Sequence, residues 1–213
     1  SLKQRKEEEI TGVGGQDTWV IPSPRNEGMA VIEVKAYDPE WPATFERIRA
    51  FVWPHVQHAS MALEHVGSTS VPGLRAKPVV DACIVVASRR DIPHVVKALA
   101  KIGYVHRGEL GVPDRAAFQP PPSLPKHHLY ASPRGSLSLR NHLGLRDYLR
   151  ANPDATSEYG ALKASLARTF PDDIDAYIAG KTQFILAVLR EIGFSEEEIA
   201  GIRSINQPEQ ADR

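Results

Sequence analysis

A serine-rich turn is the first feature of this sequence that could do chemistry. Gly67 is followed by Ser68, Thr69 and Ser70 in the stretch EHVGSTSVPGLRAKPVVD. Glycine lets the backbone approach a ligand closely, and the exposed N–H groups of a turn or helix start can hold phosphate oxygens. The three hydroxyl groups add further donors, so the turn predicts a phosphate-binding site. A capped helix start without a ligand is the alternative interpretation.

An acid within an apolar run is the second such feature. Asp81 lies among β-branched residues in VVDACIVV, where an unpaired carboxylate would be costly to bury. Such a carboxylate could hold Mg²⁺ bridged to a triphosphate, and Lys77 supplies a cation near the start of the strand. The alternative is a structural aspartate satisfied by Lys77 or by backbone N–H groups. A buried acid of this kind favours the functional interpretation.

The residue that shares a strand face with Asp81 is Cys83, because residues i and i+2 of a strand point the same way. A thiol is a poor ligand for a hard cation, so a mechanism with two metal ions lacks its second acid here. Glu64, across the turn, could supply that carboxylate, and so could Glu109 or Asp114 from a neighbouring strand or loop. Otherwise the protein could bind a nucleotide without turning it over. A Cys inside a buried strand is usually core, which disfavours Cys83 as a nucleophile.

A pair of histidines follows a proline-rich loop, in KHHLYASP. His128 and Tyr130 would share one strand face, with His127 on the other. His128 is therefore a candidate phosphate ligand or acid–base group, whereas His127 is expected to be a partly exposed strand residue. His65, beside the glycine turn, would either orient that turn by a hydrogen bond or simply pack.

Cationic side chains recur in the second half of the chain. Arg146 and Lys181 are candidate triphosphate ligands, because Lys or Arg on a helix that covers a site can hold phosphate groups. Arg140 and Lys163 lie in the same half. Ordinary surface charge is the alternative, and it is the interpretation that we adopt for Arg150.

The elements that must position these residues follow from the spacing of apolar side chains. Strands are expected at 61–65, 79–86, 104–107, 116–118 and 128–131, with 79–86 buried on both faces. Helices are expected at 38–52, 92–102, 138–151, 155–169, 172–192 and 196–202. Mixed strands and helices followed by helices alone predict an α/β (α+β) fold, with flanking helices on a mixed sheet and then a C-terminal helical segment.

Three regions follow from this pattern. Residues 1–28 predict an N-terminal extension that behaves as a mobile tail, with Trp19, Val20 and Ile21 as an alternative docking strand or partner arm. Residues 29–135 form the α/β core, opened by MAVIEV as a strand or an extended lead-in, and residues 136–205 form the helical segment packed on it. The core and helical segment are expected to make one globular unit.

Composition narrows the classes of function. Among 213 residues there are 26 Lys plus Arg and 26 Asp plus Glu, and this neutral balance argues against a nucleic-acid partner. The single cysteine excludes an internal disulfide and is compatible with a reducing cytoplasm. No apolar run approaches the roughly 18 residues of a membrane span, and the charged start lacks a signal-peptide core. A cytoplasmic protein without a membrane anchor is the expectation.

Several separated motifs occur in an order that resembles the GrpB family, a bacterial branch of the nucleotidyltransferase superfamily. They are YDPEWP, EHVGSTSVPGLRAKPVVD, HHLY and LRDYLRANPDA, and the resemblance runs from about Val34 to about Val188. The superfamily signature is a Gly-Ser turn followed by an Asp-x-Asp strand. Gly67 and Ser68 match the turn and Asp81 matches the first acid.

The sequence departs from these patterns at two positions. Cys83 stands where the superfamily has its second acid, which the family also commonly lacks. Tyr130 stands where the family usually has a histidine, which with His128 would make a His-x-His pair on one strand face. A metal site built on two histidines is therefore weakened here.

The resemblance implies a nucleotidyltransferase-like fold and, at the level of the superfamily, nucleotide chemistry. The expected activity is binding of a nucleoside triphosphate, or of another phosphorylated small molecule, with Mg²⁺ at Asp81 and Glu64. Transfer of the nucleotidyl group to a small acceptor would use Asp81 and Glu109. The alternative is a catalytically degenerate module that binds a nucleotide or a CoA-type ligand, because some family members are fused to a dephospho-CoA kinase domain. A protein that keeps only the fold, for structural or interaction purposes, is the third hypothesis.

Overall fold

The structure is a computed structural model that describes residues 31–206. The extension expected at 1–28 lies outside the described residues. Where the description begins, an extended segment leads to Lys35, which forms an isolated antiparallel bridge with Ala76. The Ile32 N–H group in this segment also donates to the Pro171 carbonyl at 2.6 Å, so the segment contacts the helical part of the chain as well as the core.

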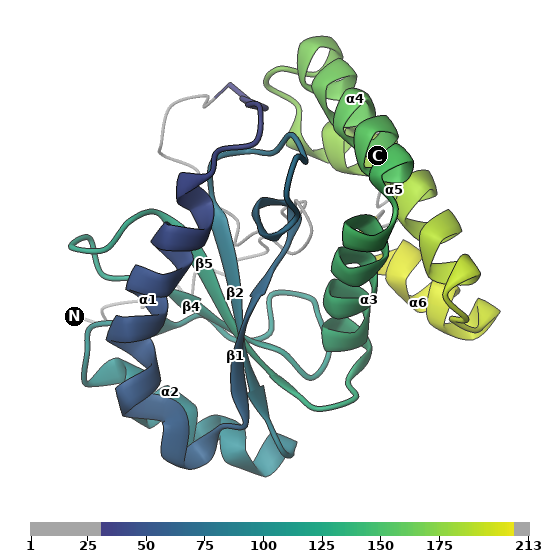
Figure 1. The fold of residues 1–213 in the computed structure, drawn as a ribbon. Helices are drawn as coiled ribbons and strands as arrows, with labels where there is room; N and C mark the ends of the chain where they lie inside the picture. Colours follow the sequence, from purple (N-terminus) through teal and green to yellow (C-terminus); the bar gives the residue numbers. More distant parts are fainter. Residues whose placement is uncertain (1–30, 207–213) are drawn as a thin grey trace, which may run out of the picture.

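A mixed sheet of five strands forms the centre of the described residues (Figure 1). The strands are β1 (Ala62–Val66), β2 (Val80–Val86), β3 (Val105–His106), β4 (Ala116–Gln119) and β5 (His127–Pro133), in the spatial order β1-β2-β5-β4-β3. Only the β2–β5 pair is parallel, and the other three neighbouring pairs are antiparallel. The fold class expected from the sequence is thus confirmed, with every residue of β2 buried.

One face of the sheet is covered by α1 (Glu40–Val56) and α2 (Ile92–Ala100), which pack on apolar side chains of β2 and β5. Asp38 marks the start of α1 as expected, because its Oδ1 accepts a hydrogen bond of 2.9 Å from the Glu40 N–H group. The helix extends past the predicted end at 52 despite Pro54. Phe51, at the helical spacing of the core residues Phe45 and Ile48, is nevertheless 37% exposed.

The other face of the sheet meets α3 (Leu137–Ala151). Leu139 of α3 packs here with Cys83 of β2 and Tyr130 of β5, which are register partners in the parallel pair. Asp81 and His128 are register partners two residues earlier, so they share this face. The helix begins earlier than the predicted residue 138, because the Ser136 hydroxyl caps it by accepting from the Leu139 N–H group.

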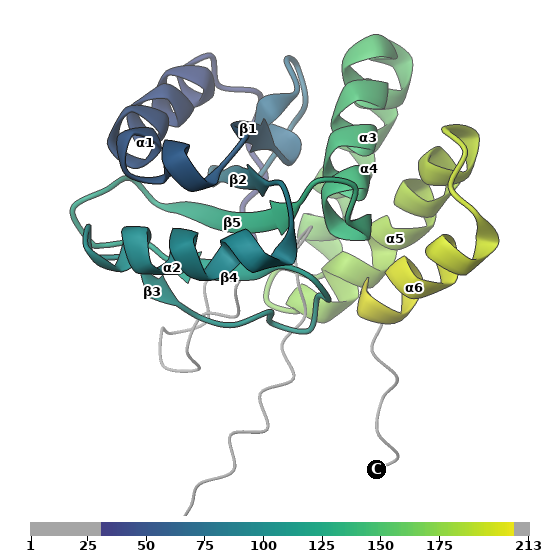
Figure 2. The same ribbon diagram turned by 90° about the horizontal axis from the view of Figure 1, so that it is seen from below.

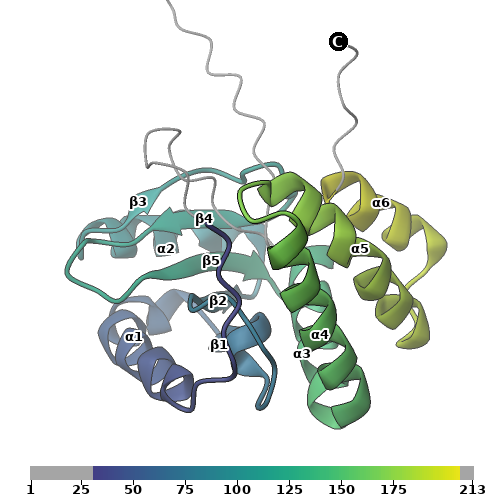
Figure 3. The same cartoon turned by 90° about the horizontal axis from the view of Figure 1, so that it is seen from above.

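The rest of the chain consists of α4 (Pro153–Thr169), α5 (Ile174–Glu191) and α6 (Glu196–Asn206). Figures 2 and 3 show these helices gathered with α3 beside the sheet, away from α1. Their apolar side chains share a cluster with Val71 and Leu74, which lie just after the glycine turn. This contact packs the helical segment against the site region. No helix within 31–206 has the length and apolar character needed to cross a membrane.

Candidate functional site

The glycine turn and the acidic strand are in direct contact. Gly67 follows the end of β1 with a φ of 68°, in the left-handed region that favours glycine. A Cβ atom at this position would collide with the Asp81 carboxylate. Glycine is therefore required at position 67 for two reasons: the left-handed backbone conformation and the close approach of the Asp81 carboxylate.

Two of the three predicted hydroxyl donors are engaged inside the turn, which is a single 3₁₀ turn over Ser68–Ser70. The Ser70 hydroxyl donates to the Gly67 carbonyl at 2.6 Å. The Thr69 hydroxyl and His65 Nε2 are 3.0 Å apart, while the His65 ring stacks on Phe45 with 4.7 Å between centroids. His65 therefore both orients the turn and packs against Phe45. Ser68, the third hydroxyl residue, lines a pocket.

Two arginines on α3 hold both ends of this turn. Arg146 Nη1 donates to the His65 carbonyl at 3.1 Å and pairs with the Glu64 carboxylate at 2.8 Å. One helical turn later, Arg150 donates to the Ser70 carbonyl from Nε at 3.0 Å and from Nη2 at 2.7 Å. The interpretation of Arg150 as an ordinary surface charge was wrong, because its guanidinium reaches across to the turn.

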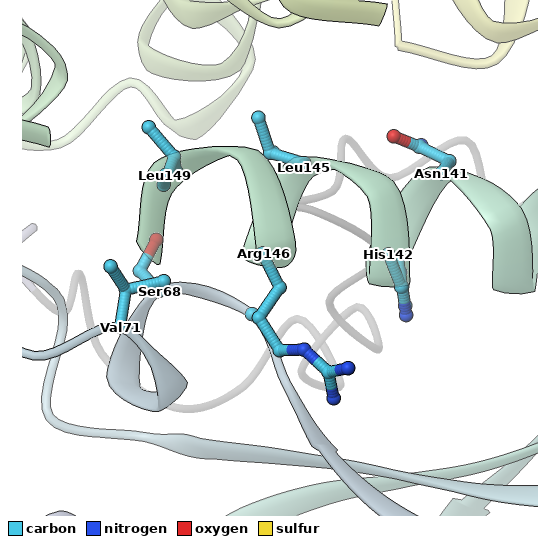
Figure 4. A pocket seen from close by; sticks show the side chains of 8 residues that line it. Ser68, Val71, Asn141, His142, Leu145, Arg146 and Leu149 are labelled. Atoms are coloured by element: carbon cyan, nitrogen blue, oxygen red, sulfur yellow. The ribbon is translucent and has the colours of Figure 1, made fainter. Parts of the chain in front are cut away.

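A pocket of about 10 Å³ lies between this turn and α3 (Figure 4), which is near the lower limit for one water molecule. Gly67 and Ser68 line it on one side, and residues of α3 line it on the other. Figure 4 shows the side chains of Arg146 and His142 projecting from the same side of α3.

The Asp81 carboxylate is held by His128. Nδ1 of His128 lies 2.8 Å from Asp81 Oδ1, and the two side chains are 11% and 12% exposed, respectively. The other carboxylate oxygen abuts Gly67. One carboxylate oxygen of Asp81 therefore contacts the His128 imidazole, and the other contacts the glycine turn.

The other candidate acids make separate contacts. Glu64 is paired with Arg146. Glu109 is exposed in the loop before β4, where its carboxylate lies 3.3 Å from Arg89 and accepts from the Asp114 N–H group at 3.2 Å.

Mg²⁺ needs several oxygen ligands around it. Across residues 31–206, no group of three or more His, Cys, Asp or Glu side chains is arranged to hold a metal ion. Binding of Mg²⁺ at Asp81 and Glu64 stays a prediction.

The Asp81 charge acts on basic side chains from three parts of the chain. Burial lowers the pKa of Lys77, just before β2, and the Asp81 charge opposes this effect. Burial also lowers the pKa of Arg115, just before β4, and the Asp81 charge again opposes this effect. Burial lowers the pKa of Lys163, on α4, to about 7, and Asp81 again opposes it. The Asp81 charge thus acts on all three cations.

Two lysines of the helical segment are buried in the same manner. Lys163 Nζ lies 4.7 Å from the centroid of the Tyr159 ring, and Lys181 Nζ lies 4.5 Å from that of Tyr177. Each tyrosine precedes its lysine by one helical turn on α4 or α5. Burial lowers the pKa of Lys181 to about 7 as well. Contact of Lys181 with a phosphate stays a prediction.

The layer between α3 and the sheet contains buried polar groups to which the sequence analysis assigned no specific role. Arg115 is fully buried, with its guanidinium carbon 4.5 Å from the centroid of the Tyr130 ring. His142 of α3 packs its ring 6.0 Å from that of Tyr130, and burial together with Arg115 lowers its pKa to about 3. His142 precedes Arg146 by one helical turn, and this spacing could have indicated that the two side chains share a face of α3.

Cys83 lies in the same layer, and it behaves as a core residue. Its side chain is fully buried, and burial raises the pKa of the thiol to about 12. The thiol therefore stays protonated at neutral pH, which removes the thiolate that a nucleophile requires.

His127 was expected to be partly exposed, and this expectation was wrong. It is buried and donates from Nδ1 to the Pro125 carbonyl at 2.6 Å. Its Nε2 then accepts from the Tyr104 hydroxyl at 2.9 Å. The proline-rich loop and the segment before β3 close over this face of β5, which strand periodicity alone does not reveal.

A glycine turn packed against an acidic strand of a mixed sheet, with a helical segment beside it, defines the class as an α/β protein with a mixed five-stranded sheet and a C-terminal helical segment. The family model described as GrpB protein matches residues 31–191. The chain belongs to the GrpB family, and the matched residues agree with the range of the sequence resemblance.

Curated relatives support this membership. The chain is 35% identical over 158 residues to the UPF0157 protein YqkA of Bacillus subtilis, covering 72% of this chain but only 45% of that protein. It is 31% identical over 170 residues to the UPF0157 protein BH1888 of Halalkalibacterium halodurans, covering 78% and 84% of the two chains. A dephospho-CoA kinase of Mycolicibacterium paratuberculosis is 30% identical over 184 residues, and the chain spans 45% of its length.

A solved structure has the same fold. The crystal structure of the conserved protein GrpB from Enterococcus faecalis matches 75% of this chain and 99% of its own, at 31% identity and a TM-score of 0.66. The Cid1 poly(U) polymerase bound to MgGTP is a more distant neighbour, at 16% identity and a TM-score of 0.43. At that level the likeness by itself indicates neither an activity nor a ligand for this chain.

Proposed function

We propose that this chain binds a nucleoside triphosphate, with its phosphates at the Gly67–Ser70 turn, and transfers the nucleotidyl group to a small acceptor. The observation that carries the proposal is that the Asp81 charge, buried against the Gly67 turn, acts on three basic side chains, Lys77, Arg115 and Lys163. Basic side chains within electrostatic range of a buried carboxylate beside a glycine turn form an environment that suits a polyanion.

The turn supports the same ligand. Its two ends are fixed by Arg146 and Arg150, which bond to the carbonyls of His65 and Ser70. The carbonyl oxygens are thereby directed toward α3, so that phosphate oxygens would meet N–H groups and the Ser68 hydroxyl. A turn fixed in advance loses little entropy when a ligand binds.

A second candidate is a ligand-binding module without turnover. The observation that favours it is the engagement of both Asp81 carboxylate oxygens, by His128 and by packing on Gly67. A ligand of the CoA type suits this candidate, because one relative carries the name dephospho-CoA kinase. Both candidates place the phosphates at the same turn, in a cytoplasmic protein without a nucleic-acid partner.

Calorimetric titrations test the proposal. The ligands are ATP, GTP, CTP, UTP, CoA and dephospho-CoA, each with and without Mg²⁺. The proteins are the wild type, Asp81→Asn and, as a matched control, Asp172→Asn at an exposed acid outside the site.

Binding of a triphosphate that depends on Mg²⁺ and is lost in Asp81→Asn, but not in Asp172→Asn, would support the transferase. Binding that persists in Asp81→Asn and does not depend on Mg²⁺ would favour the ligand-binding module without turnover. Failure of every ligand to bind the wild type would sink both candidates.

A further inference from the structure

Lys163 is a deeply buried basic residue of α4 whose side chain makes no hydrogen bond. Only 2% of its surface is exposed, and its Nζ has no hydrogen-bond partner. The Tyr159 ring, one turn earlier on α4, provides its cation–π contact. A buried ammonium without a hydrogen-bonded anion is costly, because its lost hydration is replaced only in part.

The charged and titratable groups around Lys163 come from several elements. From the sheet side, the Asp81 charge acts on Lys163 and also on Lys77. On α4 the phenol of Tyr159 lies beneath the amine, and on α5 the phenol of Tyr177 is close enough for Tyr159 to raise its pKa. Asp81 is already bonded to His128, so it is not a dedicated partner for Lys163.

We propose that Lys163 is a direct ligand for the polyphosphate group of the bound molecule and takes up a proton when that group binds. The inference rests on the proposed function, because it assumes phosphates beside Gly67 and Asp81. It adds a specific ligand role for Lys163 and a proton linkage to that function. The polyphosphate supplies the anionic hydrogen-bond acceptor that Lys163 otherwise lacks.

The direction of the linkage follows from burial. Burial lowers the pKa of Lys163 to about 7, so near pH 8 most of the amine is neutral in the free protein. An adjacent phosphate favours the ammonium and raises this pKa, and a proton enters from solvent on binding. By linkage, the same ligand binds more tightly as the pH falls toward 7.

The test is calorimetric titration with inorganic triphosphate, without a metal ion, near pH 8. Two buffers with different ionisation enthalpies give the number of protons taken up per molecule bound. The proteins are the wild type, Lys163→Met and Lys97→Met, the last being an exposed lysine on α2. Comparing variants removes protons that triphosphate itself exchanges, since that contribution is common to all three proteins.

We expect the wild type to take up close to one proton more than Lys163→Met, and to bind at least about tenfold more tightly. Lys97→Met should match the wild type in both respects. Thermal unfolding of free Lys163→Met checks that the variant is folded, and we expect no loss of stability because methionine replaces a desolvated charge.

Equal affinity and equal proton uptake in the wild type and Lys163→Met would overturn the inference and leave Lys163 a structural residue. Nucleoside triphosphate binding without any binding of inorganic triphosphate would also overturn it, while the proposed function stands. Absence of binding by either type of ligand would remove the proposed function as well.

Discussion

His128 and Asp81, 47 residues apart in sequence, are joined by a hydrogen bond of 2.8 Å. They are direct register partners on the two parallel strands β2 and β5, so their side chains leave the same face of the sheet side by side. The bond uses Nδ1 of the ring and leaves Nε2 as its remaining polar atom. An oriented imidazole is thus placed beside the first acid, in a site whose strand has Cys83 in place of the second.

Replacement of Gly67 by alanine is expected to destabilise the protein strongly. The new Cβ would meet the Asp81 carboxylate, and the residue would have to hold a φ of 68°. We expect a loss of about 2–4 kcal/mol in the free energy of unfolding, measured in urea. Gly73→Ala is the control, with a φ of 80° but open space around the added atom. It should cost only about 1 kcal/mol, and equal costs would refute the close-contact argument.

Loss of the Arg150 fork is expected to loosen the glycine turn. Lysine at this position cannot reproduce the two bonds to the Ser70 carbonyl. Arg150→Lys should lower the free energy of unfolding by about 1 kcal/mol and speed hydrogen exchange of the amides of 67–70. Arg168→Lys, on an exposed face of α4, is the control. Unchanged hydrogen exchange of these amides in Arg150→Lys would show that the turn is stable without the Arg150 hydrogen bonds.

The stability of the protein is expected to depend on Lys163 at alkaline pH. Its pKa falls from 10.5 to about 7 on folding, so the unfolded chain binds the additional proton between these values. The free energy of unfolding of the wild type should therefore rise with pH from about 7 to about 10, relative to Lys163→Met. Urea unfolding at several pH values measures this difference. Parallel curves for the two proteins would contradict it, and Lys97→Met should remain parallel to the wild type.

Acid stability is expected to depend on His65. Burial, with Arg150 and Arg146, lowers its pKa from 6.5 to about 4, so the folded form resists protonation. Stability from this group is present above pH 6.5 and is lost as the pH falls toward 4, by at most about 1.4 kcal/mol per pH unit. His65→Gln should show a shallower loss over this range in denaturant unfolding. His94→Gln, at an exposed histidine of α2, should retain the wild-type slope.

Short-range features of the chain were predictable because local forces decide them. The glycine turn before a buried β2 was predicted from residue types alone, since the left-handed conformation and the apolar run both leave local signals. The helical second half was predicted for the same reason, with its first helix placed one residue late because the Ser136 cap was missed. Hydrophobic periodicity locates an element better than it locates its end.

Only the tertiary structure decided which chemical groups meet. Parallel pairing of β2 with β5 sets His128 against Asp81, and no local pattern specifies the partner or register of a strand. The packing of α3 brings Arg150 to the turn, and the packing of α4 buries Lys163 within range of the Asp81 charge. The sequence by itself determined the turn, the acidic strand and the helices. Long-range packing, whose free energy is spread over many weak contacts, decided how their side chains form one site.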